Sequence, residues 1–506
     1  RKWGVDVFRR MRGMFALAIW DHSKQQLVLA RDPLGIKPLY YFAAKDRFVF
    51  ASELRALLAS GLTPRRLSTV GVDSYLATGS VEAPLTIVDG IKQLLPGHYL
   101  QVKVDAGVLH KDHLGDHKKA HVPADRPTAV AQLRYELEQT VRLHLVSDVP
   151  LGVFLSGGMD SSALVALMSR LSTHRPKTFS VVFDENRFTE APFSRAVAER
   201  FNTDHSEIRL SESRLIELLP NAIGAIDQPT MDGINTFVVS NAVKSAGIKV
   251  ALSGLGGDEL FAGYPSFRRA IKLSSPVSKR VLRAAASFGK IALNGSVQRQ
   301  KFWQLANSEC LPEDVYRIPR QLFSTDAITR MTGRDTSTSF HKNGHEHSRD
   351  VVNEISKLEL NGYMTNTLLR DTDAMSMAHS LEVRVPFVDT RLVDYVLSLP
   401  GEWKARAGAP KPLLADALAD LLPRDFLARP KMGFTLPFEK WLLGKLRTEV
   451  SSVLRDRSCI SVSGLSAEAV ENVWEHFLEK PRAVGWSRPW SLYVLARWCE
   501  INRVTL

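Results

Sequence analysis

The sequence predicts a mixed α/β and α+β protein with a β-rich first part and a parallel-sheet α/β domain that ends in a helical region. Length is the first observation, because 506 residues exceed what one hydrophobic core usually organises. The second is a change of period, from short apolar runs between turn residues to helical spacing interrupted by strand-like runs. A polar stretch that contains proline separates the two patterns.

The first part, residues 1–113, is expected to form largely antiparallel β structure. Its short apolar runs are typical of strands bounded by turns, and they lie at 14–21, 26–32, 39–42, 47–53, 98–104 and 108–114. Residues 114–127, LGDHKKAHVPADRP, carry charge and proline without any period. That composition predicts a linker, and we place the domain boundary there.

The second part, residues 128–506, alternates helical patterns with strand-like runs at 150–156, 177–183 and 248–253. This alternation is typical of βαβ units, which build a parallel sheet. From about residue 266 the pattern is mostly helical.

Composition excludes several classes of protein. Cys310, Cys459 and Cys499 lie far apart, which argues against a disulfide framework or a thiolate zinc site and favours a reducing cytoplasm. No apolar run is long enough to span a bilayer. The net charge of +12 is spread along the chain rather than gathered in one block, so neither nucleic acid nor a membrane is expected as a partner.

One loop, within FLSGGMDSS at 154–162, has the composition of a phosphate site. An apolar strand precedes it, and Leu164, Leu167 and Met168 follow at helical spacing. Backbone N–H groups at a helix N-terminus and nearby hydroxyls attract anions. No lysine follows the glycines, so the loop differs from that of NTPases that cleave the γ-phosphate. The candidate residues are Ser156, Gly157, Gly158, Asp160, Ser161 and Ser162.

A second stretch, VALSGLGGDELFAGY at 250–264, repeats the order of strand, Ser-Gly, acid and helix. In a parallel sheet both loops would lie at the carboxyl edge, where Asp160 and Asp258 could share one Mg²⁺ with phosphate oxygens. The alternative is a pair of tight turns in which the acids only cap helices.

The pattern S-G-G-x-D-S resembles the pyrophosphate loop of ATP pyrophosphatases. Together with 250–264, LLRDTDAMSMAHSLEVRVPFVD at 368–389 and RPKMGFTLPFEKWL at 429–442, it resembles the synthetase domain of the glutamine-dependent asparagine synthetase family. RGMFALAIWD, ARDPLGIKPLYY and ASELRALL, all before residue 60, resemble the second half of that family's glutaminase domain. The resemblance implies a partial N-terminal-nucleophile-type αββα domain followed by an ATP-pyrophosphatase domain.

The resemblance also implies a reaction, in which aspartate attacks the α-phosphorus of ATP and ammonia then displaces AMP from the acyl-adenylate. ATP and Mg²⁺ are the implied cofactors, and a homodimer is an open expectation. Lys431 matches a lysine that neutralises developing charge, and Glu382 matches a catalytic position; their rivals are a surface lysine and an ion pair with Arg384. The positions implied to contact adenosine are Leu155, Val181, Ser253 and Gly254.

Two departures from the family pattern bear on function. Leu255 stands where asparagine-forming members carry an acid, so another carboxylate is an alternative acceptor, as in a β-lactam-forming synthetase or a modifier of cell-surface or natural-product acids. The glutaminase nucleophile is a cysteine at the start of the mature chain, whereas residue 1 here is Arg. We therefore expect this chain to use free ammonia and not to hydrolyse glutamine.

Two further function classes compete with amide synthesis. An RNA-modifying enzyme would suit a basic chain, but the sequence has no zinc ribbon and no clustered basic strip. A catalytically dead scaffold is disfavoured by the presence of Asp160, Asp258 and Lys431.

Overall fold

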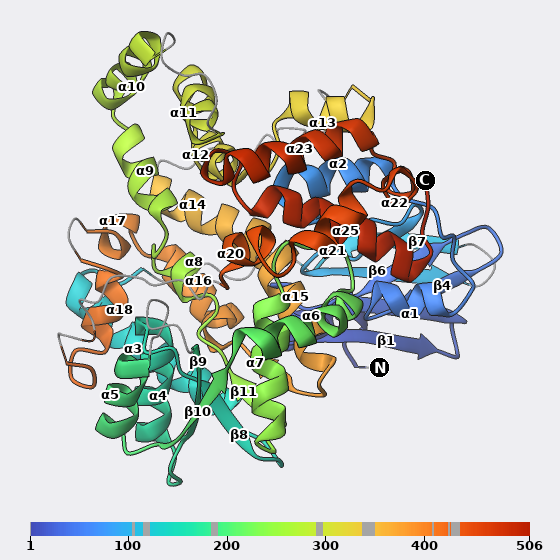
Figure 1. Ribbon diagram of the computed structural model, residues 1–506. Helices are drawn as coiled ribbons and strands as arrows, with labels where there is room; N and C mark the ends of the chain where they lie inside the picture. The colour runs from blue at the N-terminus through green and yellow to red at the C-terminus, as the bar shows by residue number, and fades with distance from the viewer. Residues whose placement is uncertain are drawn as a thin grey trace.

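The computed structural model describes residues 2–103, 107–114, 122–183, 191–289, 297–335, 350–406, 409–423, 426 and 436–506. Figure 1 shows an antiparallel β region near the N-terminus, a parallel sheet with flanking helices, and a large helical region between and above them. The predicted mixed α/β fold with a parallel sheet and a helical C-terminal region is confirmed.

Residues 16–113 contain two antiparallel sheets, as their short apolar runs predict. One sheet has the strand order β1-β2-β6-β7 and the other has the order β4-β3-β5. The strands are β1 (Ala16–Asp21), β2 (Gln26–Arg31), β3 (Tyr40–Ala43), β4 (Phe48–Ala51), β5 (Ile91–Gln93), β6 (His98–Lys103) and β7 (Gly107–His113). Their helices are η1 (Gly4–Arg10), α1 (Leu54–Ala59) and α2 (Thr69–Thr78).

The second sheet region is a five-stranded parallel sheet with the order β10-β9-β8-β11-β12. In Figure 1, α3, α4 and α5 lie on one side of this sheet and α7 lies on the other. The strands are β8 (Leu151–Phe154), β9 (Lys177–Phe183), β10 (Asp204–Leu210), β11 (Val250–Leu252) and β12 (Glu382–Arg384). The helices are α3 (Arg126–His144), α4 (Met159–Leu171), α5 (Ala191–Arg200), α6 (Glu212–Ala225) and α7 (Ile234–Ser245).

Short helices and one π-helix, η3 (Leu360–Leu369), make up most of the rest. The other elements are α8 (Gly257–Leu260), α9 (Pro265–Leu273), α10 (Pro276–Gly289), α11 (Val297–Asn307), α12 (Pro312–Arg320), α13 (Thr325–Thr332), α14 (Val351–Glu359), α15 (Arg370–Met377), η4 (Pro386–Val388), α16 (Thr390–Ser398), α17 (Gly401–Lys404), α18 (Pro412–Ala417), α20 (Phe438–Leu443), α21 (Arg447–Leu454), α22 (Arg457–Val462), α23 (Ala467–Glu479), α24 (Pro481–Val484) and α25 (Ser487–Asn502). None of the described helices is long and apolar enough to cross a membrane.

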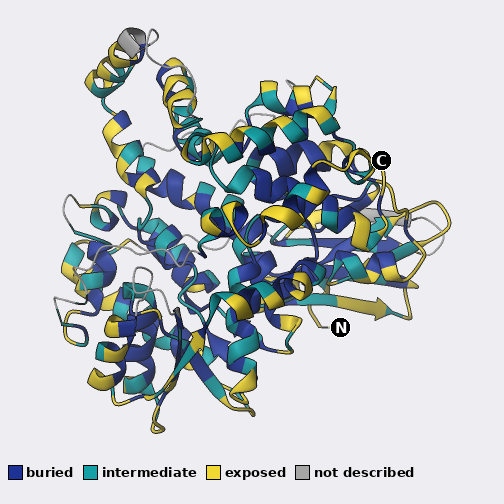
Figure 2. Ribbon diagram, in the orientation of Figure 1, coloured by how far each residue is buried: buried dark blue, intermediate teal, exposed yellow. Residues whose placement is uncertain are grey.

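One hydrophobic core joins the N-terminal region to the C-terminal helices. Tyr75 and Leu76 of α2 are buried together with Trp490 and Trp498 of α25, and the Tyr75 hydroxyl donates to the carbonyl oxygen of Ser491 at 2.8 Å. Figure 2 shows buried residues running through both regions. The two parts of the chain therefore share apolar packing, whereas a second core lies around α3, α4 and α16.

Candidate functional site

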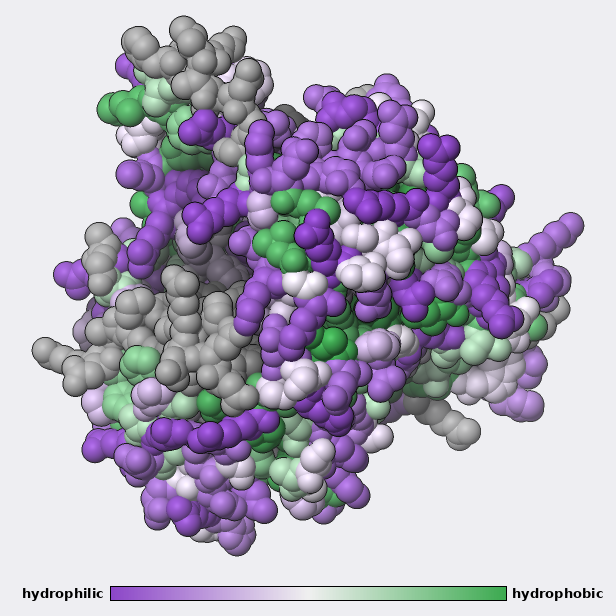
Figure 3. Space-filling model, in the orientation of Figure 1, coloured by the Kyte–Doolittle hydropathy of each residue, from purple (hydrophilic) through white to green (hydrophobic). Residues whose placement is uncertain are grey.

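The two Ser-Gly loops open into one cavity of about 1040 Å³. They meet because β8 and β11 are neighbouring parallel strands, with Leu151 beside Val250 and Val153 beside Leu252, so the following loops leave the same edge of the sheet. Figure 3 shows a largely hydrophilic surface that is hollowed beside α9, which contributes Pro265 and Arg268 to the lining.

The first loop is shaped by Gly157, whose φ is +74°. A Cβ at this position would lie 2.7 Å from both Phe193 Cβ and Ser194 N, so only glycine fits this backbone without strain. Gly158 is the N-cap of α4, and its N–H donates to Ser156 Oγ at 3.2 Å. The amino end of a 13-residue helix thus faces the cavity, which favours a bound anion.

Hydroxyl groups surround this helix start. Ser156 Oγ lies 3.1 Å from Ser161 Oγ, and Ser161 Oγ donates to the carbonyl oxygen of Gly158 at 3.1 Å. Ser162 Oγ is buried, and the described residues give it no hydrogen-bond partner. Ser156 and Ser161 line the cavity, and hydroxyls of this kind can donate to phosphate oxygens.

The second loop presses directly against the first. A Cβ at Gly254 would lie 2.9 Å from Asp160 Cβ, and one at Gly257 would meet the Asp160 carboxylate. Gly256 has a φ of +96°, which turns the chain into α8. These glycines let the two loops approach closely enough for their acids to meet.

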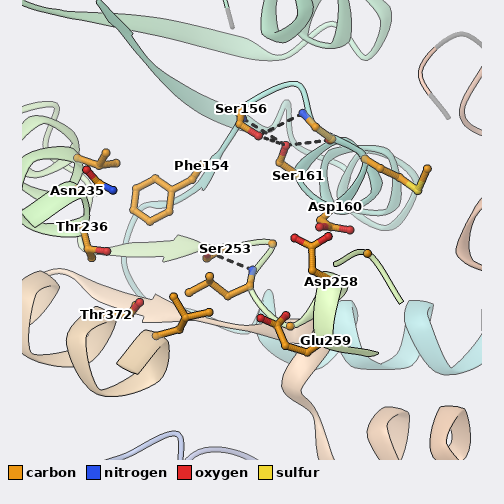
Figure 4. Close-up of a pocket in the computed structure, with 18 of the residues that line it drawn as sticks. Phe154, Ser156, Asp160, Ser161, Asn235, Thr236, Ser253, Asp258, Glu259 and Thr372 are labelled. Carbon is orange, nitrogen blue, oxygen red and sulfur yellow. Dashed lines mark hydrogen bonds between the residues drawn. The ribbon is translucent and has the colours of Figure 1, made fainter. Parts of the chain in front are cut away.

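Asp160 and Asp258 are bridged by a lysine from a third segment. Lys411 Nζ lies 2.5 Å from Asp160 Oδ2 and 2.7 Å from Asp258 Oδ1. Figure 4 shows the two carboxylates side by side at the cavity, one from each loop. Burial lowers the pKa of Lys411, but the charges of the two carboxylates outweigh it and hold that pKa above its ordinary value.

The carboxylate pair fits the implied Mg²⁺. The carboxylates of Asp160 and Asp258 both contact one cation, Lys411 Nζ, so a single ion placed between them could contact both. Among the described residues no group of three or more His, Cys, Asp or Glu side chains forms a closed metal cage. Mg²⁺ commonly binds one or two carboxylates together with substrate phosphates, which matches this open arrangement.

A second wall of the cavity pairs acids with tyrosines. The Tyr264 hydroxyl donates to Glu259 Oε1 at 2.6 Å, and the Tyr363 hydroxyl donates to Asp232 Oδ2 at 3.0 Å. Burial raises the pKa of Glu259 to about 7. All four residues line the cavity, which thus offers acidic and hydroxyl groups in addition to the helix start and hydroxyls of the first loop.

The structure brings most of the predicted residues together. The predicted positions that line the cavity are Leu155, Ser156, Gly158, Asp160, Ser161, Val181, Ser253, Gly254, Leu255 and Asp258. Gly157 and Ser162 belong to the same loop and helix start but are not part of the lining. The chemical roles given to these residues stay predictions.

The two positions expected to be catalytic are Glu382 and Lys431. Glu382 is not among the lining residues; it begins β12, where Arg384 Nε donates to its Oε1 at 2.8 Å. This contact is the ion pair named above as the alternative, and the catalytic role of Glu382 stays a prediction. Lys431 lies outside the described residues.

Several lining residues have no counterpart among the sequence candidates. Lys411 lies in GAPKPLL, a stretch with no recognisable chemical pattern. Asp232 lies in a bend before α7 and Tyr363 lies in the π-helix η3, and neither belongs to a predicted motif. Asp371 falls in the stretch 368–389 that resembles the family, so that resemblance was the available signal for it. Burial raises the pKa of Asp371 to about 6.

Family models match nearly the whole chain. Residues 132–500 match the model of asparagine synthase, and residues 1–112 match the model of a glutamine amidotransferase domain. The linker predicted at 114–127 falls between these two matches, although α3 already begins at Arg126. The exact boundary stays a prediction.

Characterised proteins show the same likeness. The chain is 29% identical to asparagine synthetase (glutamine-hydrolyzing) 1 of Bacillus subtilis, over 90% of the chain and 73% of the relative. It is 30% identical to asparagine synthetase (glutamine-hydrolyzing) 3 of the same organism, over 90% and 73%. Amidase chyE of Penicillium rubens is 26% identical over 96% of the chain and 79% of its own length. With a family model matched over more than half its length, the chain belongs to the asparagine synthase family.

Proposed function

We propose that this protein makes an amide in two steps at one site, with aspartate as the leading acceptor: aspartate, ATP and ammonia give asparagine, AMP and pyrophosphate. Membership of the asparagine synthase family supports ATP-dependent amide formation in general. The observation that carries the proposal is the meeting of two Ser-Gly loops at one cavity, with Asp160 and Asp258 held by one cation.

The proposed chemistry makes a carboxylate reactive. A carboxylate oxygen attacks the α-phosphorus of ATP, and the bond to the bridging oxygen breaks, so pyrophosphate leaves with the electron pair. Ammonia then adds to the acyl carbon, loses a proton, and AMP leaves as the mixed anhydride breaks. The first step needs the pyrophosphate to be held and its charge neutralised, because charge builds up on the leaving group.

The loop residues suit that task. Ser156 and Ser161 present hydroxyls at the cavity wall, where the amino end of α4 also lies, and the dipole of that helix favours an anion. Asp160 and Asp258 would hold Mg²⁺, which would supply positive charge to the phosphate oxygens. Lys431 remains the candidate for a second positive charge near the reacting groups.

Leu255 bears on the identity of the acceptor acid. Leu255 lines the cavity as an apolar side chain, and the relatives include both asparagine synthetases and an amidase. An enzyme that adenylates a different carboxylate, as a β-lactam-forming synthetase does, is therefore the second candidate. Ammonia as the nitrogen source, released from glutamine, is also a proposal, supported by the amidotransferase match. A cytoplasmic location and a homodimer stay predictions from the sequence.

Pyrophosphate exchange tests the proposal. We expect labelled pyrophosphate to enter ATP only when Mg²⁺ and a suitable carboxylic acid are present, because adenylation is reversible. A panel with aspartate and other acids identifies the acceptor. Asp160→Asn should lower the exchange rate by about a hundredfold or more, since it removes a charge fixed in the site. Exchange supported by other acids but not by aspartate would leave amide formation standing and refute aspartate.

If none of the acids in the panel supports exchange, the adenylation step itself is contradicted. A second assay addresses the nitrogen source, by comparing amide formation from ammonium chloride with amide formation from glutamine. Release of glutamate would support glutamine as the nitrogen source, whereas amide formation from ammonium chloride alone would support free ammonia.

A further inference from the structure

Lys411 is held in the site by an unusual backbone. Its φ is +44°, in the left-handed region that non-glycine residues rarely adopt, and it immediately precedes Pro412 at the start of α18. The residue is 6% exposed and lines the cavity. A strained backbone at a cavity indicates that the position of the side chain matters to function.

The space for the lysine stem depends on a glycine in the second loop. A Cβ at Gly263 would lie 2.6 Å from Lys411 Cε and would also meet the Asp258 carboxylate. The chain therefore accommodates the lysine by leaving out a side chain. This close fit indicates a built contact rather than a surface lysine that happens to reach two acids.

The ammonium and a metal ion would compete for the same oxygens. Lys411 Nζ donates to both oxygens of Asp160, each at 2.5 Å, and lies 2.7 Å from Asp258 Oδ1. These carboxylates are the acceptors that the described residues provide for it. A cation that displaced Nζ from them would leave a buried ammonium without compensation, which is strongly unfavourable.

We infer that Lys411 is a built-in competitor of the divalent cation, so that the metal binds tightly only together with the phosphate chain of the nucleotide. This inference rests on the proposed function, since it concerns the metal of the same adenylating site. Phosphate oxygens in the cavity supply new acceptors for the displaced ammonium, and they also complete the coordination of the metal. Metal and nucleotide therefore strengthen each other's binding, by the same factor in both directions.

A metal titration tests the inference without any turnover. Mn²⁺ serves as the probe, and free Mn²⁺ is followed by electron paramagnetic resonance while the protein is titrated with and without pyrophosphate. Because pyrophosphate itself binds Mn²⁺, each affinity is taken relative to the same mixture without protein. We expect weak binding to the unchanged protein alone and binding at least about tenfold tighter when pyrophosphate is present. Lys411→Met should bind Mn²⁺ at least about tenfold more tightly without pyrophosphate, and should lose most of the enhancement.

Two control variants make the result specific. Lys411→Arg keeps the charge and should keep the dependence on pyrophosphate. Lys445→Met removes the same charge from an exposed ion pair with Glu212 and should bind Mn²⁺ like the unchanged protein. Circular dichroism checks that each variant folds.

Three results would overturn the inference. They are tight Mn²⁺ binding by the unchanged protein without pyrophosphate, unchanged affinity in a folded Lys411→Met variant, and weaker affinity in that variant. If Lys411→Met does not fold, the inference is decided by whether the unchanged protein binds Mn²⁺ weakly without pyrophosphate and more tightly with it. Failure of the proposed function is seen separately, as absence of pyrophosphate exchange with every acid.

Discussion

Gly157 and Leu255 show how single residues shape the two loops. Gly157 needs its freedom because its φ is +74° and because Phe193 and Ser194 leave no room for a side chain. Leu255 packs partly against the core around α4 and also lines the cavity, so in the proposed function its side chain would border the acceptor acid.

Gly157→Ala should lower the rate of pyrophosphate exchange by about tenfold or more, because the added Cβ displaces the loop that faces the phosphates. The matched control is Gly224→Ala in α6, where a new Cβ meets no atom within 4 Å. That control should keep the exchange rate of the unchanged protein. Equal rates in both variants would show that the loop backbone can move without consequence.

Leu255→Asp should lower the KM for aspartate on the order of tenfold, which corresponds to about 1.4 kcal/mol. The new carboxylate would attract the α-ammonium group of aspartate, while acids that lack an ammonium group should gain nothing. Exchange kinetics with aspartate and with succinate, which lacks the ammonium group, separate these effects. An equal change for both acids would show that Leu255 acts only through the shape of the cavity.

At the scale of elements, α17 packs against α14 through a buried lysine. Lys404 is 0% exposed, and its Nζ donates to Asn353 Oδ1 and, at 3.4 Å, to Ser356 Oγ. Burial lowers the pKa of Lys404 to about 7, while the charge of Asp350 opposes this and that of Lys357 adds to it. The folded protein thus releases a proton that the unfolded chain keeps up to its ordinary pKa of 10.5.

This difference predicts how stability depends on pH. Because the unfolded state binds the extra proton between about pH 7 and pH 10, the Lys404 contribution to the free energy of unfolding rises with pH across that window. The slope is about 1.4 kcal/mol per pH unit. The Lys404→Met variant should lack this slope. The free energy of unfolding of the unchanged protein should therefore rise with pH relative to that of the variant.

Urea unfolding of both proteins between about pH 7 and pH 9 measures that difference. Lys445→Met, which changes an exposed lysine, should follow the unchanged protein instead. A constant difference between the unchanged protein and Lys404→Met would mean that Lys404 stays charged in the fold.

At the scale of the whole molecule, the N-terminal sheets are tied to the C-terminal helices. Leu76 of α2 is 0% exposed in the core that also holds Trp474, Trp490 and Trp498. Trp498 Nε1 donates to the carbonyl oxygen of Ile226 at 3.1 Å, which joins this core to α6 beside the parallel sheet. The N-terminal sheets, the C-terminal helices and α6 should therefore unfold together.

Leu76→Ala should lower the free energy of unfolding by about 2–5 kcal/mol, through lost apolar contacts and the cavity left behind. Tryptophan fluorescence during urea unfolding reports mainly on the C-terminal helices and should show the shift. Val70→Ala in the same helix is the control, because Val70 is 45% exposed and should have little effect. A fluorescence transition unchanged by Leu76→Ala would show that the two parts unfold independently.

Local patterns in the sequence accounted for much of the fold. Strand 177–183 and the helix that follows the first loop were predicted from apolar spacing and are found as β9 and α4. The edge strands β10 and β12 escaped prediction, because β10 is largely polar and half-buried, and β12 has only three residues. The paired Ser-Gly loops were predictable because each follows its own buried strand.

The sequence determined which loops carry glycines, hydroxyls and acids, since those properties are written in neighbouring residues. Tertiary structure alone placed Lys411 between Asp160 and Asp258, because its partner Asp160 lies 251 positions away and no period or motif connects them. It also placed Arg384 against Glu382 in β12, a contact that the sequence alone could not distinguish from a catalytic position. Such choices depend on which distant surfaces pack together, and packing is a property of the folded chain.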